Sequence, residues 1–292
     1  DKKYFSITNL KNTNMGYTYS LSVLFEKSFH FGLDLAASYT FGHSKSVYDG
    51  TSSVAYSNWK YNYAVDSNNP GLAYSMFDIP HRVMVSVGYR TPRYAKGFMA
   101  TTVSLVYNGY VGQRYSLTMN ESYYDAEKKK TVYIDYNGDG WGGNSLLYIP
   151  TEDELQKMDF KTEEDRRKFD EWIEGDSYAK KHRGAYAMRN SNSAPWENRV
   201  DLHVAQDIFV LKDRGSKFQV TFDVTNFANM LNKKWGTTYT AAYNVMPLQV
   251  IGSKKGEDGN YTNSYAYNSR NTITKNDVLS RWHAQIGFKY IF

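Results

Sequence analysis

Apolar and polar residues alternate with a period of two over several long stretches of the chain. From Tyr17 to Phe25 every second residue is apolar or aromatic, and hydroxyl side chains occupy most of the opposite positions. Successive side chains of a strand point to opposite faces, so this period predicts a β-strand with one apolar face. The alternation resumes from Phe29 to Phe41, and the two stretches together predict a hairpin.

The same pattern predicts further strands, which bring the total to seven. They are centred on residues 83–89, 101–107, 200–204, 218–224 and 282–292. The strands reach roughly ten residues, the length that crosses a bilayer at a tilt, whereas strands of globular proteins are usually about five or six residues long. Between residues 29 and 41, aromatic side chains stand at both ends, with Leu33 and Leu35 in the middle. An apolar band between aromatic girdles is typical of transmembrane β-barrels.

The connections between these strands alternate between very short and very long. The short ones lie around Lys27, Pro92 and Asp213, and the long ones cover about 42–80, 111–197 and 226–279. Outer-membrane barrels have short periplasmic turns and long external loops, so the short turns are predicted to face the periplasm. A secreted β-sandwich is the alternative, but it predicts shorter strands and gives no reason for the asymmetry.

The predicted fold is therefore all-β, a transmembrane antiparallel up-and-down β-barrel with long extracellular loops. Bacterial single-chain barrels normally close with an even number of strands, and seven is odd. The start of the chain also lacks the charged and then apolar segments of a signal peptide. We therefore expect residues 1–292 to be the C-terminal part of one barrel domain, with further strands upstream of Asp1.

The large extracellular loop predicted at residues 111–197 carries signals of helix formation. Thr151 and Thr162 each begin a capping-box pattern, and apolar residues follow at helical spacing between 169 and 173. These signals predict a short helical insert in the loop. Its apolar stripe either packs on the loop and the barrel rim or grips a partner.

The segment from Asp135 to Gly140 matches the first half of a calcium loop. Asp135, Asn137 and Asp139 place oxygen ligands at alternating positions, and glycine stands where the chain must turn sharply. The match then fails, because Leu146 occupies the position of the bidentate Glu. The three residues are candidate Ca²⁺ ligands, with an ordinary polar turn as the alternative.

Four aromatic residues in the loop before Pro80 are candidate ligand-binding residues. Tyr56, Trp59, Tyr61 and Tyr63 stand among Asn and Ser side chains. Such flat amphipathic rings can stack on sugars or pack against peptide. Alternatively, they hold the loop together.

Composition agrees with a β-protein and argues against several other classes. Aromatic residues make up 16% of the chain, with 27 Tyr and no Cys, and the net charge of +5 is small and scattered. We therefore expect no nucleic-acid partner and no cysteine-based metal site. Mean hydropathy is −0.63, and no apolar run approaches the roughly 20 residues of a transmembrane helix. The six His residues show no metal-binding or catalytic spacing, so we expect no enzyme.

Short sequence blocks follow one another in a defined order after residue 77. They are Phe77–Arg82, Tyr107–Gly109 with Gly112–Gln113, Asn137–Gly140, Leu147–Pro150, His182–Gly184, Arg189–Asn190, Pro195–Trp196, Asp201–Leu202 with Gln206, Asp223–Asn226 and Trp235–Gly236. Their order resembles the C-terminal barrel portion of the TonB-dependent outer-membrane receptors of Bacteroidetes, of the Oar-like and SusC-like kind. The resemblance implies a barrel of about 22 strands, of which this chain supplies the last seven or so.

The same resemblance implies a function and a set of partners. It implies an N-terminal plug and a TonB-contacting region, both upstream of Asp1, and energised import of a large nutrient such as a glycan, a peptide or a metal complex. Members of this family often work with a surface lipoprotein lid. The alternatives are a passive porin-like channel and a surface adhesin or structural barrel, which would use the same long loops without transport.

The C-terminal strand carries a candidate assembly signal. Its apolar face consists of Trp282, Ala284, Ile286, Phe288, Tyr290 and Phe292. A terminal strand that alternates in this way and ends on an aromatic residue resembles the signal that barrel assembly machinery recognises. We assign this role to Trp282, Ile286, Phe288, Tyr290 and Phe292.

Overall fold

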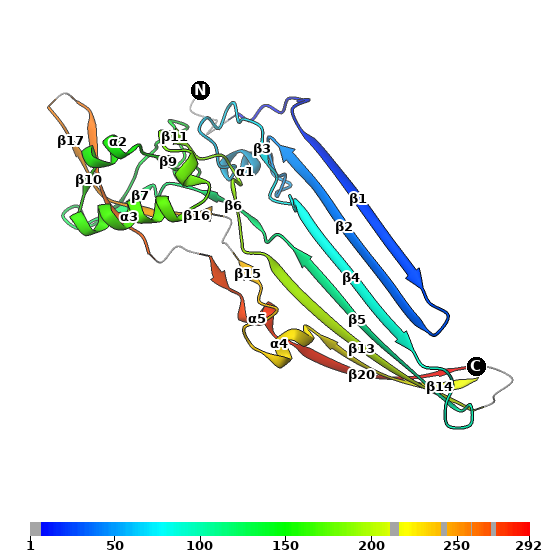
Figure 1. Ribbon diagram of the computed structural model, residues 1–292. Coiled ribbons are helices and arrows are strands. Elements are labelled where there is room, and N and C mark those ends of the chain that lie inside the picture. Colours follow the sequence, from blue (N-terminus) through cyan, green and yellow to red (C-terminus); the bar gives the residue numbers. More distant parts are fainter. Residues whose placement is uncertain (1–6, 211–215, 241–243, 258, 270–272) are drawn as a thin grey trace.

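A computed structural model describes residues 7–210, 216–240, 244–257, 259–269 and 273–292 of the chain. Its largest sheet has eight strands: the short β3 (Ala73–Tyr74), which pairs with the end of β2, and seven long antiparallel strands that follow one another in chain order (Figure 1). The long strands are β1 (Tyr17–Ser28), β2 (Leu33–Ser46), β4 (His81–Arg90), β5 (Met99–Tyr110), β13 (Glu197–Phe209), β14 (Lys217–Thr225) and β20 (His283–Ile291). All seven predicted strands are therefore present, in the predicted up-and-down order.

The sheet is open among the described residues. β1 pairs only with β2 among the long strands, and β20 pairs only with β14, so the described strands do not close into a barrel. Seven strands are too few, because the smallest single-chain outer-membrane barrels have about eight. The total of about 22 strands remains a prediction.

The register of the sheet separates an apolar face from a polar face. Val23 lies opposite Tyr39, and Tyr39 lies opposite Val83. One residue further along, Ser22 lies opposite Thr40, and their hydroxyls are 2.9 Å apart. The apolar side chains have no covering layer, since Leu21 is 67% exposed and Phe288 is 79% exposed. An apolar face of this size is stable only against lipid or another apolar surface.

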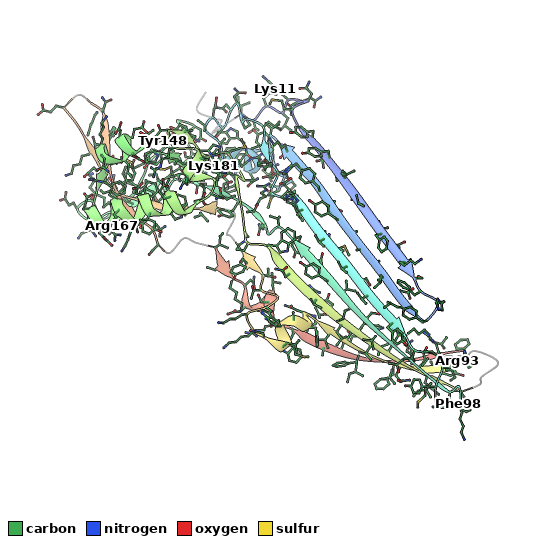
Figure 2. The ribbon with its side chains drawn as sticks, viewed as in Figure 1. Lys11, Arg93, Phe98, Tyr148, Arg167 and Lys181 are labelled. Carbon is green, nitrogen blue, oxygen red and sulfur yellow. The ribbon has the colours of Figure 1, made fainter. Side chains whose placement is uncertain are left out.

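Short and long connections lie at opposite ends of the sheet. Residues 29–32 and 91–98 make the short turns (Figure 2 labels Arg93 and Phe98 at this end). Gly32 has a φ of 95°, and a side chain there would collide with the carbonyl oxygen of Arg90, which explains the glycine. The third predicted turn, around Asp213, falls within residues 211–215 and lies outside the described residues. The long connections, 47–80, 111–196 and 226–282, all lie at the other end (Figure 1).

The main hydrophobic core lies in the long connections and not in the sheet. Its buried residues are Tyr115, Leu117, Leu147, Ile149, Leu155, Phe169, Ile173, Ala179, Ala187, Val245 and Leu248. β6 (Arg114–Leu117) joins two connections, because it pairs with β12 (Asn192–Ser193) and, in parallel, with β16 (Asn244–Val245). The loops therefore fold together into one packed cap over this end of the sheet.

The predicted helical insert is present in the cap as α2 (Glu152–Lys157) and α3 (Glu163–Gly175). Thr151 and Glu154 form the capping box of α2, since the Glu154 amide donates to Thr151 Oγ1 at 3.2 Å and the Thr151 amide donates to Glu154 Oε2 at 2.9 Å. α3 buries Phe169 and Ile173 completely. Its apolar stripe therefore packs within the cap.

Shorter elements complete the fold. They are α1 (Ala55–Lys60), β3 (Ala73–Tyr74), β7 (Ser122–Asp125), β8 (Lys130–Tyr133), β9 (Tyr148–Ile149), β10 (Asp159–Phe160), a 3-10 helix (Ala179–Lys181), β11 (Ala185–Tyr186), α4 (Phe227–Leu231), β15 (Tyr239–Thr240), β17 (Leu248–Lys255), β18 (Tyr261–Tyr267), β19 (Thr274–Lys275) and α5 (Asp277–Ser280). No helix in the described part of the chain is long and apolar enough to cross a membrane.

Candidate functional site

The polar face of the sheet carries charges of both signs near the short turns. Asp207 is almost fully buried and accepts hydrogen bonds from Arg90 Nη2 at 2.7 Å, Lys217 Nζ at 2.7 Å and Gln219 Nε2 at 2.8 Å. These four residues belong to β4, β13 and β14, so the contacts span the sheet laterally. They stabilise a polar wall through its own hydrogen bonds and ion pairs.

Further along the polar face, His203 Nδ1 and Asp223 Oδ1 form a hydrogen-bonded contact between β13 and β14. Asp201 accepts hydrogen bonds from Arg199 Nε at 2.9 Å and from the Asn226 amide at 2.7 Å. The side chains of His203 and Asp223 are both partly exposed to solvent. The face can therefore line a water-filled space with groups of either charge.

A hollow of about 410 Å³ lies on this side of the sheet, near the short turns. It is lined by small side chains such as Ala36, Ser86 and Gly88, with the carboxylates of Glu26 and Asp34 among the lining groups. The small residues explain the hollow, because their neighbours on the same face do not fill the space above them.

Two of the four predicted aromatic residues face one cavity. Tyr56 and Trp59 stack with ring centroids 5.7 Å apart, and both line a cavity of about 650 Å³. Trp59 Nε1 also donates to Asn68 Oδ1 at 3.2 Å, a contact within the same loop. Tyr61 is exposed, and neither Tyr61 nor Tyr63 lines the cavity. The structure therefore brings together a pair of rings and not a platform of four; their role in binding a ligand remains a prediction.

The calcium-like segment forms a hydrogen-bonded turn. Asp135 accepts hydrogen bonds from the amides of Asp139 at 3.2 Å and Gly140 at 2.8 Å. Asp139 Oδ2 accepts from Ser67 Oγ at 2.6 Å, and Asn137 Nδ2 donates to the same oxygen at 3.2 Å. No group of three or more His, Cys, Asp and Glu side chains in the described ranges is arranged to hold a metal ion. Binding of Ca²⁺ by Asp135, Asn137 and Asp139 remains a prediction.

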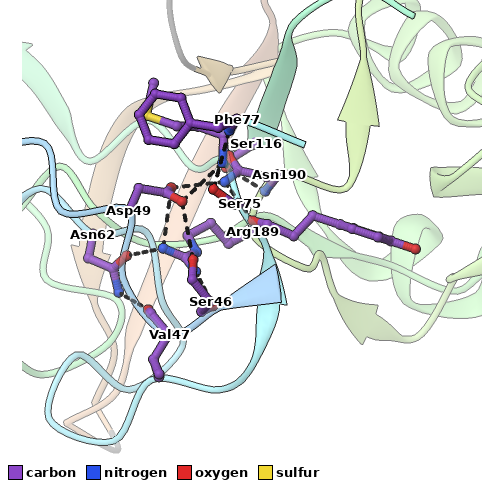
Figure 3. A network of polar contacts seen from close by, with 11 residues as sticks. Ser46, Val47, Asp49, Asn62, Ser75, Phe77, Ser116, Arg189 and Asn190 are labelled. Atoms are coloured by element: carbon purple, nitrogen blue, oxygen red, sulfur yellow. Dashed lines mark hydrogen bonds and ion pairs between the residues drawn. The ribbon is translucent and has the colours of Figure 1, made fainter. Parts of the chain in front are cut away.

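A buried polar network joins the first two long loops (Figure 3). Arg189 is 4% exposed; its Nη1 donates to Asn62 Oδ1 at 2.6 Å and lies 3.3 Å from Asp49 Oδ2. Its neighbour Asn190 donates to the same Asp49 oxygen at 3.0 Å and to the Tyr74 carbonyl at 2.8 Å. Burial lowers the pKa of Arg189, and the charge of Asp49 opposes this shift. The pair stabilises the loops only while both charges are present.

A second buried ion pair lies where β2 and the cap meet. Arg114 donates to Asp78 Oδ2 from Nε at 2.9 Å and from Nη2 at 2.6 Å. The Ser44 amide donates to the other oxygen of Asp78 at 2.6 Å. Asp78 is thereby satisfied on both oxygens, and it ties the end of β2 to β6.

Sequence reasoning missed these two networks as structural features. Arg189 and Asp49 are 140 positions apart, so no local pattern relates them. Asp78 and the pair Arg189–Asn190 did stand in blocks that carried the family resemblance. Their positions in the blocks were the only signal that these polar residues had a specific role.

The predicted assembly residues lie where the pattern placed them. Ile286, Phe288 and Tyr290 project from the apolar face of β20, where they lie opposite Phe222, Val220 and Phe218. Trp282 precedes this strand, Phe292 ends the chain, and all five side chains are exposed. Recognition by assembly machinery remains a prediction.

Comparison with known proteins identifies the kind of domain. A family model described as "Outer membrane beta barrel domain" matches residues 2–279, nearly the whole chain. Neither the curated proteins nor the solved structures contain a match.

Proposed function

Since this chain belongs to the family of outer membrane β-barrel domains, we propose that it forms the C-terminal wall of a TonB-dependent transporter. The protein resides in the bacterial outer membrane, with its apolar face against lipid. In the proposal, the complete protein imports a large nutrient, such as a glycan, a peptide or a metal complex. The chain binds and conducts this cargo and performs no covalent chemistry on it.

The contrast between the two faces of the sheet is the observation that carries the proposal. One face exposes Leu21, Phe25 and Phe288, and the other holds the Asp207 cluster and the His203–Asp223 pair. A wall that is apolar outside and charged inside fits an aqueous conduit through a bilayer. The polar face has both signs of charge, which suits a polar cargo better than an ion of one sign.

The cap supports uptake of a large ligand at the external end. Loops that only shielded a small pore would not need a hydrophobic core of their own, whereas this cap has one. A rigid cap with the Tyr56–Trp59 pair at one cavity can present a defined surface to a ligand. In the proposal, a surface lipoprotein lid docks on this side, and TonB contacts a region upstream of Asp1.

Conductance of the full-length protein in planar lipid bilayers tests the proposal. A TonB-dependent transporter is closed by its plug, so we expect no steady conductance until the plug is removed by deletion or denaturant. Stable open-channel steps from the untreated protein would contradict the proposal and identify a passive porin.

A closed protein without transport would fit an adhesin or a structural barrel instead. Site-specific crosslinking in energised cells separates these cases, because only a TonB-dependent transporter captures TonB. A closed barrel that never crosslinks to TonB would also overturn the proposal.

A further inference from the structure

Glu121 is a buried carboxylate with an oxygen that has no partner in the described structure. The residue is 5% exposed and follows β6 in the largest loop. Its Oε1 accepts a hydrogen bond from the Ser145 amide at 3.0 Å, whereas Oε2 is buried without any hydrogen-bond partner among the described residues. Burying a charged oxygen without a hydrogen-bond donor costs folding free energy, and a bound water or cation would reduce this cost.

Other oxygen atoms surround this free carboxylate oxygen. The Ser145 hydroxyl lies beside the Glu121 carboxylate, yet its oxygen also has no hydrogen-bond partner of good geometry among the described residues. A side chain added at Gly142 would place its Cβ 3.6 Å from Glu121 Oε2 and 3.6 Å from the Ile134 carbonyl oxygen. The two oxygens thus flank one point of space, which glycine leaves open.

The surrounding charge favours a cation in this space. Burial raises the pKa of Glu121 to about 7, and the negative charge of nearby Asp139 adds to this shift. No cationic side chain forms an ion pair with Glu121 among the described residues. A bound cation would offset both effects at once, because it would replace water around the carboxylate and balance the charge of Asp139.

We propose that Glu121, Ser145 and the Ile134 carbonyl form a Ca²⁺ site that joins the end of β6 to the segment 134–145. All the ligands are hard oxygen atoms, the kind that Ca²⁺ prefers. One carboxylate makes a weak site, in the range of about 10⁻⁴–10⁻³ M that suits an extracellular module. The site differs from the Asp135–Asn137–Asp139 turn, where hydrogen bonds within the turn and from Ser67 already occupy the carboxylates.

Terbium luminescence of the full-length protein in detergent tests the site. Tb³⁺ replaces Ca²⁺ at oxygen sites, and Tyr136 and Trp141 lie in the same segment as possible sensitisers. We expect saturable sensitised emission that millimolar Ca²⁺ displaces. Glu121→Gln should weaken Tb³⁺ binding by about tenfold or more, while the exposed control Glu127→Gln should leave binding unchanged.

Two further variants distinguish the outcomes. Gly142→Ala fills the space with one methyl group and keeps the carboxylate, so it should also weaken binding; Gly142 has a backbone conformation that alanine tolerates. Asp135→Asn should leave binding intact. Loss of emission in Asp135→Asn but not in Glu121→Gln would move the ion to the turn and overturn the proposal. If the wild type shows no sensitised emission that Ca²⁺ displaces, water occupies the space and the proposal is also overturned.

Discussion

At the scale of single residues, the contact between the first two long loops depends on Arg189. Its guanidinium contacts the carbonyl of Ser46, the last residue of β2, and the side chains of Asp49 and Asn62 in the loop that follows. Removal of one partner from a buried ion pair leaves the other charge without compensation, which costs about 3–5 kcal/mol. The contact between the first two long loops therefore requires both Arg189 and Asp49.

We expect Arg189→Met to destabilise the cap by about 3 kcal/mol, because the Asp49 carboxylate stays buried without its cation. Limited proteolysis of residues 47–80 measures the effect as faster cleavage. Arg167→Met is the matched control, since Arg167 pairs with Glu164 and Glu171 on the exposed side of α3 and should cost under about 1 kcal/mol. Equal proteolysis of the two variants would show that the buried network does not hold the loops.

Glu121 should make the stability of the cap depend on pH when no metal ion is present. Burial raises its pKa in the folded protein to about 7, above the ordinary value of 4.5. The folded state therefore binds the proton more tightly than the unfolded state, and stability is highest below about pH 4.5 and decreases as the pH rises toward 7.

When a chelator removes metal ions, Glu121→Gln should abolish this decrease of stability with rising pH. We expect the variant to be more stable than the wild type at pH 8 by about 2 kcal/mol, a value reduced for partial screening by solvent, and nearly equal to it at pH 4. Thermal melting followed by tryptophan fluorescence at both pH values measures the difference. A wild-type advantage at pH 8 would contradict the shifted pKa.

At the scale of elements, β20 is the strand whose pairing matters most for assembly. It pairs with β14 along its whole length and leaves its other edge unpaired in the described sheet. Backbone groups without partners cost several kcal/mol each in lipid, so this edge must pair with another strand in the complete barrel.

We expect deletion of Tyr290–Phe292 in the full-length protein to reduce assembled, heat-modifiable barrel several-fold, because it removes apolar-face residues and backbone pairs of the edge strand. Deletion of residues 255–257, at the end of the β17–β18 hairpin, should have a much smaller effect, since this segment lies outside the sheet of long strands. Semi-native gel electrophoresis of outer-membrane fractions compares the two. Equal assembly would show that the strand is not a membrane-inserted edge.

At the scale of the whole molecule, the chain has two parts in different surroundings: the sheet faces lipid, and the cap faces water. The sheet exposes an apolar face and has few buried residues, whereas the cap has a core of its own. The sheet therefore depends on lipid for stability, and the cap depends on its own packing.

The intact protein should remain with outer membranes after washing in high salt and should leave them only in detergent, because its apolar face needs lipid or detergent. Density-gradient fractionation followed by a salt wash and a detergent wash measures this. Recovery of the wild type as a soluble monomer would contradict the lipid-facing assignment of the sheet.

A substitution in the cap core should have a different effect. Phe169→Ala should destabilise the cap by about 3–5 kcal/mol without releasing the protein from the membrane.

The positions of the long strands follow from the sequence alone. Alternation with a period of two is a local property, and it located seven strands, their apolar faces and the contrast between short and long connections. The capping boxes at Thr151 and Thr162 located α2 and α3 for the same reason, since their hydrogen bonds connect residues three positions apart. The match to outer membrane β-barrel domains agrees with this pattern.

The arrangement of the long loops depends on contacts that exist only in the folded protein. The cap core, the Arg189–Asp49 pair and the Arg114–Asp78 pair join residues from separate connections, and no periodicity relates them. Tyr56 and Trp59 lie three positions apart in the short helix α1 and line one cavity, whereas Tyr61, the residue after this helix, does not line it. Likewise, the sequence around Glu121 does not distinguish it from other loop carboxylates, because its burial against Ser145 arises only in the folded protein. Local chemistry fixes the strands, whereas contacts between distant residues decide the polar sites.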